Sequence, residues 1–320
     1  MWQAEQPFAD WPPLCEKLLD LSRSDLLACR GQPAAGPRPD GPTCTGMLSS
    51  IDRSVGVDHP EDLRLVVEEV AIKRFRQHAA NLAGFTELQA LSGVIGTMML
   101  MQHYGAPTRL LDWTESVWVG LYFACYGDWH KDGVLWVCDR ALLTRGVHER
   151  FADETEVMRR VNREEHWAQL SKLARPWVCP LFQQGFQSER MAVQQGFFTF
   201  ASRLGLDHAE WIDRVIPDPE PGVAVGGEGP IGKQRIRIAA PLKPRVLKEL
   251  AKMNVTGSSL FPGLDGVGEH LQAAARFLAT DHAVELHAEV FAARARELAR
   301  PSARPLATAF EDLSGGPGAA

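Results

Sequence analysis

Residues 102–114 read Gln-His-Tyr-Gly-Ala-Pro-Thr-Arg-Leu-Leu-Asp-Trp-Thr, and the segment continues through Ser116 to Tyr-Phe-Ala at 122–124. Many polar and aromatic side chains therefore lie close together among apolar residues. Burying each polar group without a partner costs roughly 1–3 kcal/mol, so a segment that only packs would not need them. Either these groups satisfy one another in a structural cluster, or they line a pocket.

The overall composition is that of an ordinary globular protein. Of 320 residues, 45% are hydrophobic and 23% are charged, and 34 basic against 40 acidic side chains give a net charge of −6. This balance provides no general attraction to nucleic acid or to an anionic membrane, although it leaves room for a local basic groove. No apolar run approaches the roughly 18 residues that a membrane span needs. The first residues lack the features of a signal peptide, so we expect a cytoplasmic protein without membrane contact.

Several chemistries find no motif in this chain. There is no P-loop, no GxSxG elbow, no HExxH and no dinucleotide fingerprint, and a nuclease is disfavoured because no Asp/Glu/His metal constellation is visible. The cysteines form no CxxC pair and no ligand-like spacing with His, so we predict reduced, mostly buried thiols and no metal site. They are Cys15, Cys29, Cys44, Cys125, Cys138 and Cys179. A thiol nucleophile at Cys29 is the less favoured alternative to a buried strand cysteine.

Hydrophobic periodicity divides the chain into short strands and helices. The helix that follows Pro60 has apolar residues such as Leu63, Val66 and Val70 near helical spacing. Strands are expected at 26–29, 47–53, 108–113, 134–138, 197–200 and 234–238. Helices are expected within 1–25, from 61, and at 88–103, 117–126, 140–175, 243–253, 266–277 and 282–298, with a glycine-rich loop at 221–232.

These elements predict an α+β fold, a single domain with a central mixed or antiparallel sheet flanked by helices. The main domain is expected to span 26–275, after a helical lead-in over 1–25. A C-terminal helix over 276–299 and a disordered tail over 300–320 follow it.

The central segment resembles the FRG domain family, which is named for a Phe-Arg-Gly motif. Further matches lie in Arg30-Gly31-Gln32, Ser50-Ile51 with Arg53, Glu68 with Phe75, Arg190 followed by Gln194, Gly196 and Phe198, and 260–266. Together they span about residues 26 to 275, so the resemblance assigns this whole region to an FRG domain.

The family is in turn distantly similar to the ADP-ribosyltransferase superfamily. The similarity lies in an early strand that ends in Arg and in a Ser/Thr-bearing strand followed by a helix. It implies an ADP-ribosyltransferase-like fold, NAD as substrate, and transfer of ADP-ribose to a protein or nucleic acid. It also implies a bacterial toxin or anti-phage defence effector, for which a neutralising antitoxin is a candidate partner. The alternative is a non-catalytic module that senses nucleotides or mediates interactions in a defence system.

Transfer of ADP-ribose passes through an oxocarbenium-like transition state. The site needs a cation for the pyrophosphate, hydrogen bonds to the ribose, an aromatic face for nicotinamide and a carboxylate or amide near the ribose. The predicted catalytic residues are Arg30, His103, Tyr104, Thr114 and Gln194. The predicted cofactor-binding residues are Arg30, Gly31, Gln32, Arg109, Trp113 and Ser116.

Most of these residues also have a structural interpretation. Arg30 could pair with a carboxylate, and His103 with Tyr104 could simply end a helix. Thr114 or Ser116 could cap the helix that follows, which is compatible with ligand binding because a helix N-terminus attracts anions.

The acidic residue of the site is not assigned by the sequence. Arg109 and Asp112 lie three apart on a short strand and are expected to face opposite sides. Asp112 is favoured as an anchor that accepts backbone N–H groups of the following turn. Gln194 stands where transferases usually place a Glu, and an amide cannot offset positive charge as a carboxylate does. Nothing local singles out the nearby Glu189.

Overall fold

The computed structural model divides the chain into two compact units, Met1–Glu269 and His270–Ala320. It describes residues 6–34, 46–82, 84, 90–148, 156, 159, 161, 176–181, 188–216, 231–264, 266–268 and 271. Everything below concerns the first unit. The expected helix at 282–298 and the tail at 300–320 lie outside the described residues, as do most of 140–175, 221–232 and 266–277.

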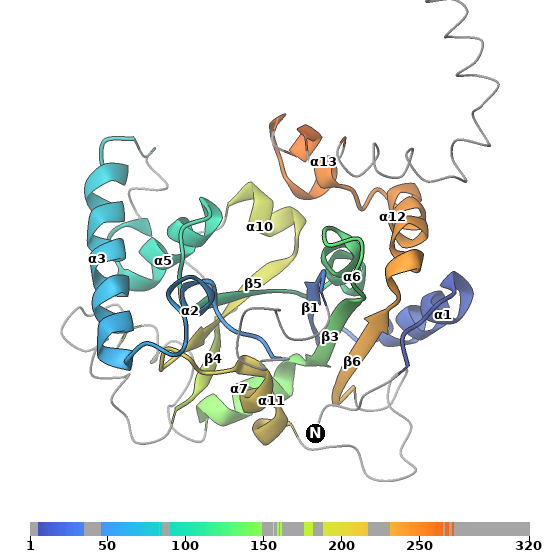
Figure 1. Cartoon of the computed structure of the whole chain (residues 1–320), viewed down its shortest axis with the longest axis horizontal. Coiled ribbons are helices and arrows are strands. Elements are labelled where there is room, and N and C mark those ends of the chain that lie inside the picture. The colour runs from blue at the N-terminus through green and yellow to red at the C-terminus, as the bar shows by residue number, and fades with distance from the viewer. Residues whose placement is uncertain are drawn as a thin grey trace, which may run out of the picture. The chain divides into compact units, whose positions relative to one another are not determined.

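A six-stranded antiparallel sheet forms the centre of the fold, in the order β4-β5-β2-β1-β3-β6 (Figure 1). Its strands are β1 (Leu27–Gln32), β2 (Leu110–Thr114), β3 (Gly133–Asp139), β4 (Val178–Leu181), β5 (Gly196–Ala201) and β6 (Lys233–Ile238). The expected α+β class with an antiparallel sheet is therefore confirmed.

The sheet is split between β1 and β2. Cys29 opposite Thr114 is the single register pair between these two described strands. Beyond it, β1 continues along β3 as far as Gln32 opposite Val134. β2 pairs with β5 over its whole length, back to Leu110. The two half-sheets therefore diverge from a shared corner, and their backbone groups do not bridge the gap.

Helices cover both faces of the sheet (Figure 1). They are α1 (Trp11–Leu21), α2 (Ser50–Val55), α3 (Glu61–Ala79), α5 (Val94–His103), α6 (Val117–Cys125), α7 (Arg140–His148), α10 (Glu189–Val193), α11 (His208–Val215), a 3-10 turn (Ala240–Leu242), α12 (Lys243–Lys252) and α13 (Gly257–Leu260). The predicted buried helix at 117–126 and the helix at 243–253 are confirmed, and the helix expected from residue 88 begins at Val94.

The hydrophobic core follows the split. On one face, residues of α5, β2, β4 and β5 form one cluster, and residues of α1, α6, α12, β1, β3 and β6 form another. On the other face a continuous cluster joins β1, β2, β3 and β5 to α7 and α11. The split is thus sealed by apolar side chains on one side and opens between two separate clusters on the other.

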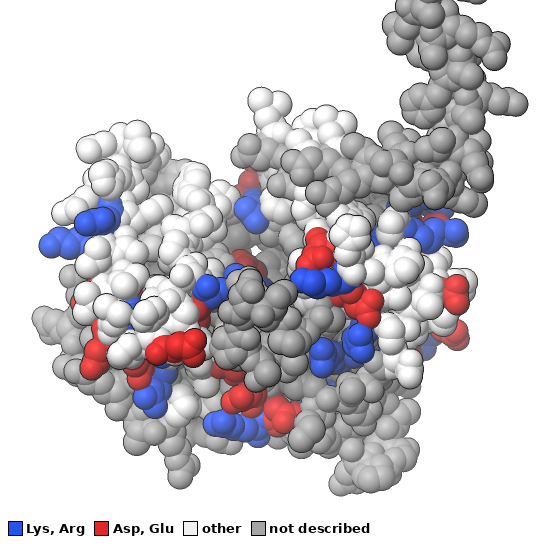
Figure 2. Space-filling view, in the orientation of Figure 1, with Lys and Arg blue, Asp and Glu red and all other residues white. Residues whose placement is uncertain are grey.

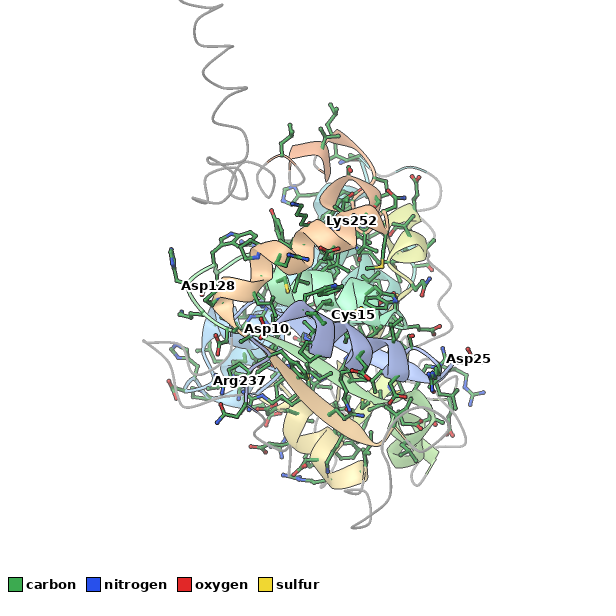
Figure 3. The ribbon with its side chains drawn as sticks, turned by 90° about the vertical axis from the view of Figure 1, so that its right-hand side faces the viewer. Asp10, Cys15, Asp25, Asp128, Arg237 and Lys252 are labelled. Carbon is green, nitrogen blue, oxygen red and sulfur yellow. The ribbon has the colours of Figure 1, made fainter. Side chains whose placement is uncertain are left out.

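The N-terminal segment covers the edge of the sheet at β6. Figure 3 shows α1, which carries Cys15, crossing this side of the molecule between α12 and β6. Leu14, Leu18 and Leu21 of α1 are fully buried. The backbone of Phe8 makes a parallel bridge to Ile238, which occupies part of an otherwise open strand edge.

One expected strand is wrong. Residues 47–53 were expected to be extended, but Ser50–Val55 forms α2. Ser49 caps this helix by accepting a hydrogen bond from the Asp52 backbone, and the Ser49 hydroxyl donates to the Asp52 carboxylate over 2.6 Å. A serine followed three residues later by an acidic residue is a helix-start signal that the apolar pattern concealed.

Helix α3 is present where expected, but its apolar stripe faces outward. Leu63, Val66 and Val70 are 47%, 54% and 42% exposed, whereas Arg64 and Glu68 are buried. Arg64 pairs with Asp52 over 3.1 Å, and Glu68 pairs with Arg109. Buried ion pairs, rather than apolar contacts alone, therefore determine which side of α3 faces the core.

Candidate functional site

Arg30 spans the split in the sheet. Its Nη1 donates a 2.6 Å hydrogen bond to the backbone carbonyl of Asp112 on β2 and lies 3.9 Å from the Asp112 carboxylate. The Nε of Arg30 is buried and has no hydrogen-bond partner among the described residues. The guanidinium thus takes the place of the missing strand contacts and keeps an unused donor.

Helix α2 brings a second arginine to the same place. The backbone N–H of Ile51 and the hydroxyl of Ser50 both donate to the Thr108 carbonyl, which fixes α2 beside the start of β2. Burial lowers the pKa of Arg30 to about 10; the Asp112 carboxylate opposes this decrease and the charge of Arg53 adds to it. Arg53 therefore lies within electrostatic reach of Arg30, and Arg30 remains charged at neutral pH.

Asp112 is the exposed carboxylate at the split. Its side chain is 59% exposed, and its Oδ2 accepts a 2.8 Å hydrogen bond from Gln102 Nε2 at the end of α5. The expectation that Asp112 accepts backbone N–H groups of the following turn is wrong, because Thr114 Oγ1 accepts the N–H of Ser116 there. Sequence reasoning gave no role to Gln102, although it is the first residue of the polar segment.

A third arginine approaches from α10. The guanidinium of Arg190 stacks over the ring of Phe261, 4.5 Å from its centroid, and Phe261 meets Phe123 of α6 edge-on at 6.0 Å. Burial lowers the pKa of Arg190, and the Asp112 carboxylate opposes this effect. An aromatic bridge thus joins α10 to α6, with a positive charge near Asp112.

The surface is hollowed where these groups meet. Figure 2 shows the hollow between the region of α10 and that of α6, with blue and red atoms at its edge. Its position agrees with the two separate core clusters on this face of the sheet. A hollow that combines guanidinium groups with the exposed Asp112 carboxylate suits a ligand that carries phosphate groups together with hydroxyls.

Comparison with known proteins identifies the central part of the chain. Residues 44–133 match the family model described as the FRG domain. The chain contains an FRG domain. No curated protein and no solved structure matches the chain, so the expected likeness to ADP-ribosyltransferases stays a proposal. The match includes Arg53, Gln102 and Asp112, while Arg30 and Arg190 lie outside it, and the wider limits of 26–275 stay a prediction.

Two of the predicted site residues, Thr114 and Gln194, connect the end of β2 to α10 and α13 by hydrogen bonds. The hydroxyl of Thr114 donates to the Gln194 carbonyl over 2.7 Å, and Gln194 Nε2 donates to the Leu260 carbonyl over 2.9 Å. Ser116 caps α6 by accepting the Val119 N–H. The structural interpretation of Ser116 as a cap is therefore confirmed, and these hydrogen bonds fix one wall of the hollow.

Gly31 and Gln32 pack β1 against its neighbours, α6 and β3. A Cβ on Gly31 would lie 2.1 Å from the Gly120 carbonyl oxygen and 2.3 Å from the Ala124 nitrogen, so glycine permits α6 to lie directly on the strand. Gln32 Oε1 accepts a 2.7 Å hydrogen bond from the Trp136 indole. Both positions are explained by contacts within the protein.

His103 and Tyr104 end α5. Their rings meet edge-on with centroids 4.9 Å apart, and Tyr104 is 63% exposed. Tyr104 follows Gln102 by two residues, at the C-cap of α5. Their predicted roles toward ribose and nicotinamide stay predictions.

Arg109 and Trp113 are buried in the core of the FRG domain. Arg109 Nε lies 2.8 and 3.1 Å from the two Glu68 carboxylate oxygens, and its Nη1 donates to the Ala201 and Ser202 carbonyls. The Trp113 indole donates to Thr199 on the far face of the sheet. The prediction that Arg109 and Asp112 do not pair with each other is therefore confirmed. Because neither Arg109 nor Trp113 reaches the surface, the site proposed below does not include them.

A buried histidine, His208, interacts electrostatically with Arg30. His208 is fully buried, and its Nδ1 shares a 2.8 Å hydrogen bond with the Thr199 hydroxyl, which also accepts from the Trp113 indole. The pKa of His208 is lowered from 6.5 to about 3, mainly by burial and in smaller part by the charge of Arg30. The imidazole is therefore neutral in the folded protein.

This histidine predicts a pH dependence of stability. Between pH 6.5 and 3 the unfolded chain binds a proton that folded His208 does not, so stability falls as pH decreases below 6.5. Its share of the slope approaches about 1.4 kcal/mol per pH unit. Urea unfolding at pH 7, 6 and 5 should show a shallower slope for His208→Gln than for wild type, and an unchanged slope for exposed His59→Gln. Equal slopes in all three proteins contradict the prediction.

Other chemistry has little support in the described part of the chain. No group of three or more His, Cys, Asp or Glu side chains gathers there as a metal site. No described helix has the length and apolar character to cross a membrane. The described cysteines are free, and Cys29 is buried, which raises the pKa of its thiol and disfavours the thiolate that a nucleophile requires.

Proposed function

We propose that this FRG protein binds NAD in the hollow over the split between β1 and β2 and transfers ADP-ribose to a macromolecular acceptor, a protein or a nucleic acid. The observation that carries the proposal is the position of Arg30, whose guanidinium bridges the split 3.9 Å from the Asp112 carboxylate. An enzyme of this class would act as a toxin or anti-phage effector, and a neutralising antitoxin is a candidate partner.

The groups at the hollow match what NAD requires. The pyrophosphate carries two negative charges, and guanidinium groups bind phosphate oxygens through paired donors. Arg30 and Arg190 each interact electrostatically with Asp112, and Arg53 interacts with Arg30, in a chain whose net charge is −6. The Asp112 carboxylate, held by the Gln102 amide, offers an acceptor for ribose hydroxyls. Tyr104, which is 63% exposed at the end of α5, is the aromatic side chain proposed for nicotinamide.

Arg30→Ala tests the proposal directly. The chain is incubated with NAD labelled in nicotinamide and with pools of protein, DNA and RNA acceptors. We expect wild type to release nicotinamide and Arg30→Ala to release it about 10- to 100-fold more slowly, because a hydrogen bond to a charged group contributes about 1.5–3 kcal/mol. Arg30→Lys keeps the positive charge but loses the paired N–H donors of the guanidinium, so its rate of nicotinamide release should lie between those of wild type and Arg30→Ala.

A matched control is available on α12. Arg245 is 61% exposed and pairs with Glu249 on its own helix, so Arg245→Ala should release nicotinamide at the wild-type rate. Circular dichroism establishes that each variant is folded. Absence of nicotinamide release by wild type with every acceptor, together with no NAD-dependent rise in unfolding temperature, would overturn the proposal.

A non-catalytic nucleotide-sensing module is the second candidate. It is favoured by the hydrogen bonds that occupy Thr114, Ser116 and Gln194 within the fold, since groups used for structure are not available for chemistry. In that case NAD raises the unfolding temperature of wild type but not of Arg30→Ala, and no nicotinamide is released.

A further inference from the structure

The side chain of Asp112 is held by a chain of hydrogen bonds that starts in the backbone of β2. The Leu110 N–H donates to Thr108 Oγ1 over 3.1 Å, and the Thr108 hydroxyl donates to Gln102 Oε1 over 2.6 Å. This fixes the amide of Gln102 with its nitrogen toward Asp112, to which it donates over 2.8 Å. The carboxylate therefore has a defined orientation although it is exposed.

Asp112 differs from the other acidic side chains near the split. Asp52 and Glu68 are buried in ion pairs with Arg64 and Arg109. Asp112 keeps Oδ1 without a hydrogen-bond partner among the described residues, and its side chain is 59% exposed. An oriented carboxylate with one free oxygen, beside a guanidinium, can face a ligand that the guanidinium binds.

We propose that Asp112 is the catalytic carboxylate of this site and that Gln102 is its positioning residue. The inference rests on the proposed function and supplies the acidic group that Gln194 cannot provide. Asp112 lies at the start of the split, where the half-sheets diverge and Arg30 crosses between them. A dinucleotide whose pyrophosphate contacts the arginines would place a ribose within reach of Asp112.

The chemistry balances with these groups alone. The bond between ribose C1′ and the nicotinamide nitrogen breaks, and its electron pair leaves with nicotinamide, which departs neutral. Positive charge develops on C1′ and the ring oxygen, where the Asp112 carboxylate offsets it. A nitrogen or oxygen of the acceptor forms the new bond to C1′ and loses its proton to Asp112, from which the proton passes to water.

The experiment compares two carboxylates. Asp112→Asn keeps the shape of the side chain and removes its charge, and Glu189→Gln makes the same change in α10. With ADP-ribose as the probe, calorimetry should show Asp112→Asn binding within about threefold of wild type, because the arginines remain. Its nicotinamide release under single-turnover conditions should fall about 100-fold. Glu189→Gln should match wild type in both measurements.

Gln102 has its own readout. Gln102→Ala should lower kcat about tenfold with unchanged KM, because the carboxylate loses its orientation while the phosphate contacts stay. Gln102→Glu, which places a second negative charge beside Asp112, should lower kcat further. A role in stability alone would lower the unfolding temperature and leave kcat unchanged.

The outcomes separate the two proposals. Wild-type release with an equally active Asp112→Asn overturns the assignment of Asp112 and leaves the proposed function standing. If Glu189→Gln loses nicotinamide release and Asp112→Asn keeps it, Glu189 is the catalytic carboxylate and the assignment of Asp112 is overturned. A wild-type protein that releases no nicotinamide with any acceptor overturns both proposals.

Discussion

Arg109→Met is expected to lower the free energy of unfolding by about 3–5 kcal/mol. Arg109 and Glu68 are each 1% exposed, and Arg109 contacts both carboxylate oxygens of Glu68 as well as two backbone carbonyls. Burial raises the pKa of Glu68, and the Arg109 guanidinium opposes this effect. Without Arg109 the buried carboxylate must stay charged without a partner or take up a proton, and both cost stability.

The control for Arg109→Met removes the other partner as well. Arg109→Met with Glu68→Met leaves no buried charge at this position, so urea unfolding should recover more than half of the stability that the single variant loses. Part of the loss stays, because the Ala201 and Ser202 carbonyls lose their donors. A single variant that loses less than about 1 kcal/mol contradicts the ion pair's role in anchoring α3.

Gly31→Ala is expected to cost about 3 kcal/mol or more, at the upper end of overpacking effects. The added methyl would lie 2.1, 2.3 and 2.6 Å from backbone atoms of Gly120, Ala124 and Phe123. Backbone atoms of a helix cannot rotate away, so α6 must move off β1. Denaturant unfolding measures the loss.

Gly120→Ala is the matched control in the same interface. Its Cβ would meet side-chain atoms, Leu135 Cδ1 at 2.8 Å and Cys29 Cβ at 3.0 Å. Leu135 Cδ1 can rotate away, whereas Cys29 Cβ is fixed to the backbone and must shift by a small amount. Because alanine is favoured over glycine in a helix by about 1 kcal/mol, the net loss should be smaller than for Gly31→Ala. If Gly31 were instead a ligand contact, Gly31→Ala would keep its stability and lose affinity for NAD.

Much of the fold could be predicted from the chain's own periodicity. The apolar run at 134–138 and the alternation at 234–238 predicted strands that are present as β3 and β6. The helix at 117–126 is present as α6. These signals depend on local spacing, which the sequence records directly. The start of α2 was missed because its capping residues lie within an apolar pattern of strand length.

The sequence located the candidate site, but it did not show which of its polar residues are buried in the core and which face the surface. Thirteen neighbouring positions hold Arg109 in the core and Asp112 at the surface. The partner of Arg109 is Glu68, 41 residues away, and the arginine beside Asp112 is Arg30, 82 residues away. No spacing rule connects such pairs, because sheet order and helix packing bring them together.

The sequence by itself identified an FRG domain from the polar segment at 102–114, which lies within the residues 44–133 that match the family model. It also determined where most strands and helices begin, since periodicity and capping are local properties. The tertiary structure decided which polar groups stabilise the fold and which face a ligand. That choice depends on burial, and the divergence of β1 from β2 after Cys29 leaves Arg30 and Asp112 at an open split while Arg109 and Trp113 are enclosed.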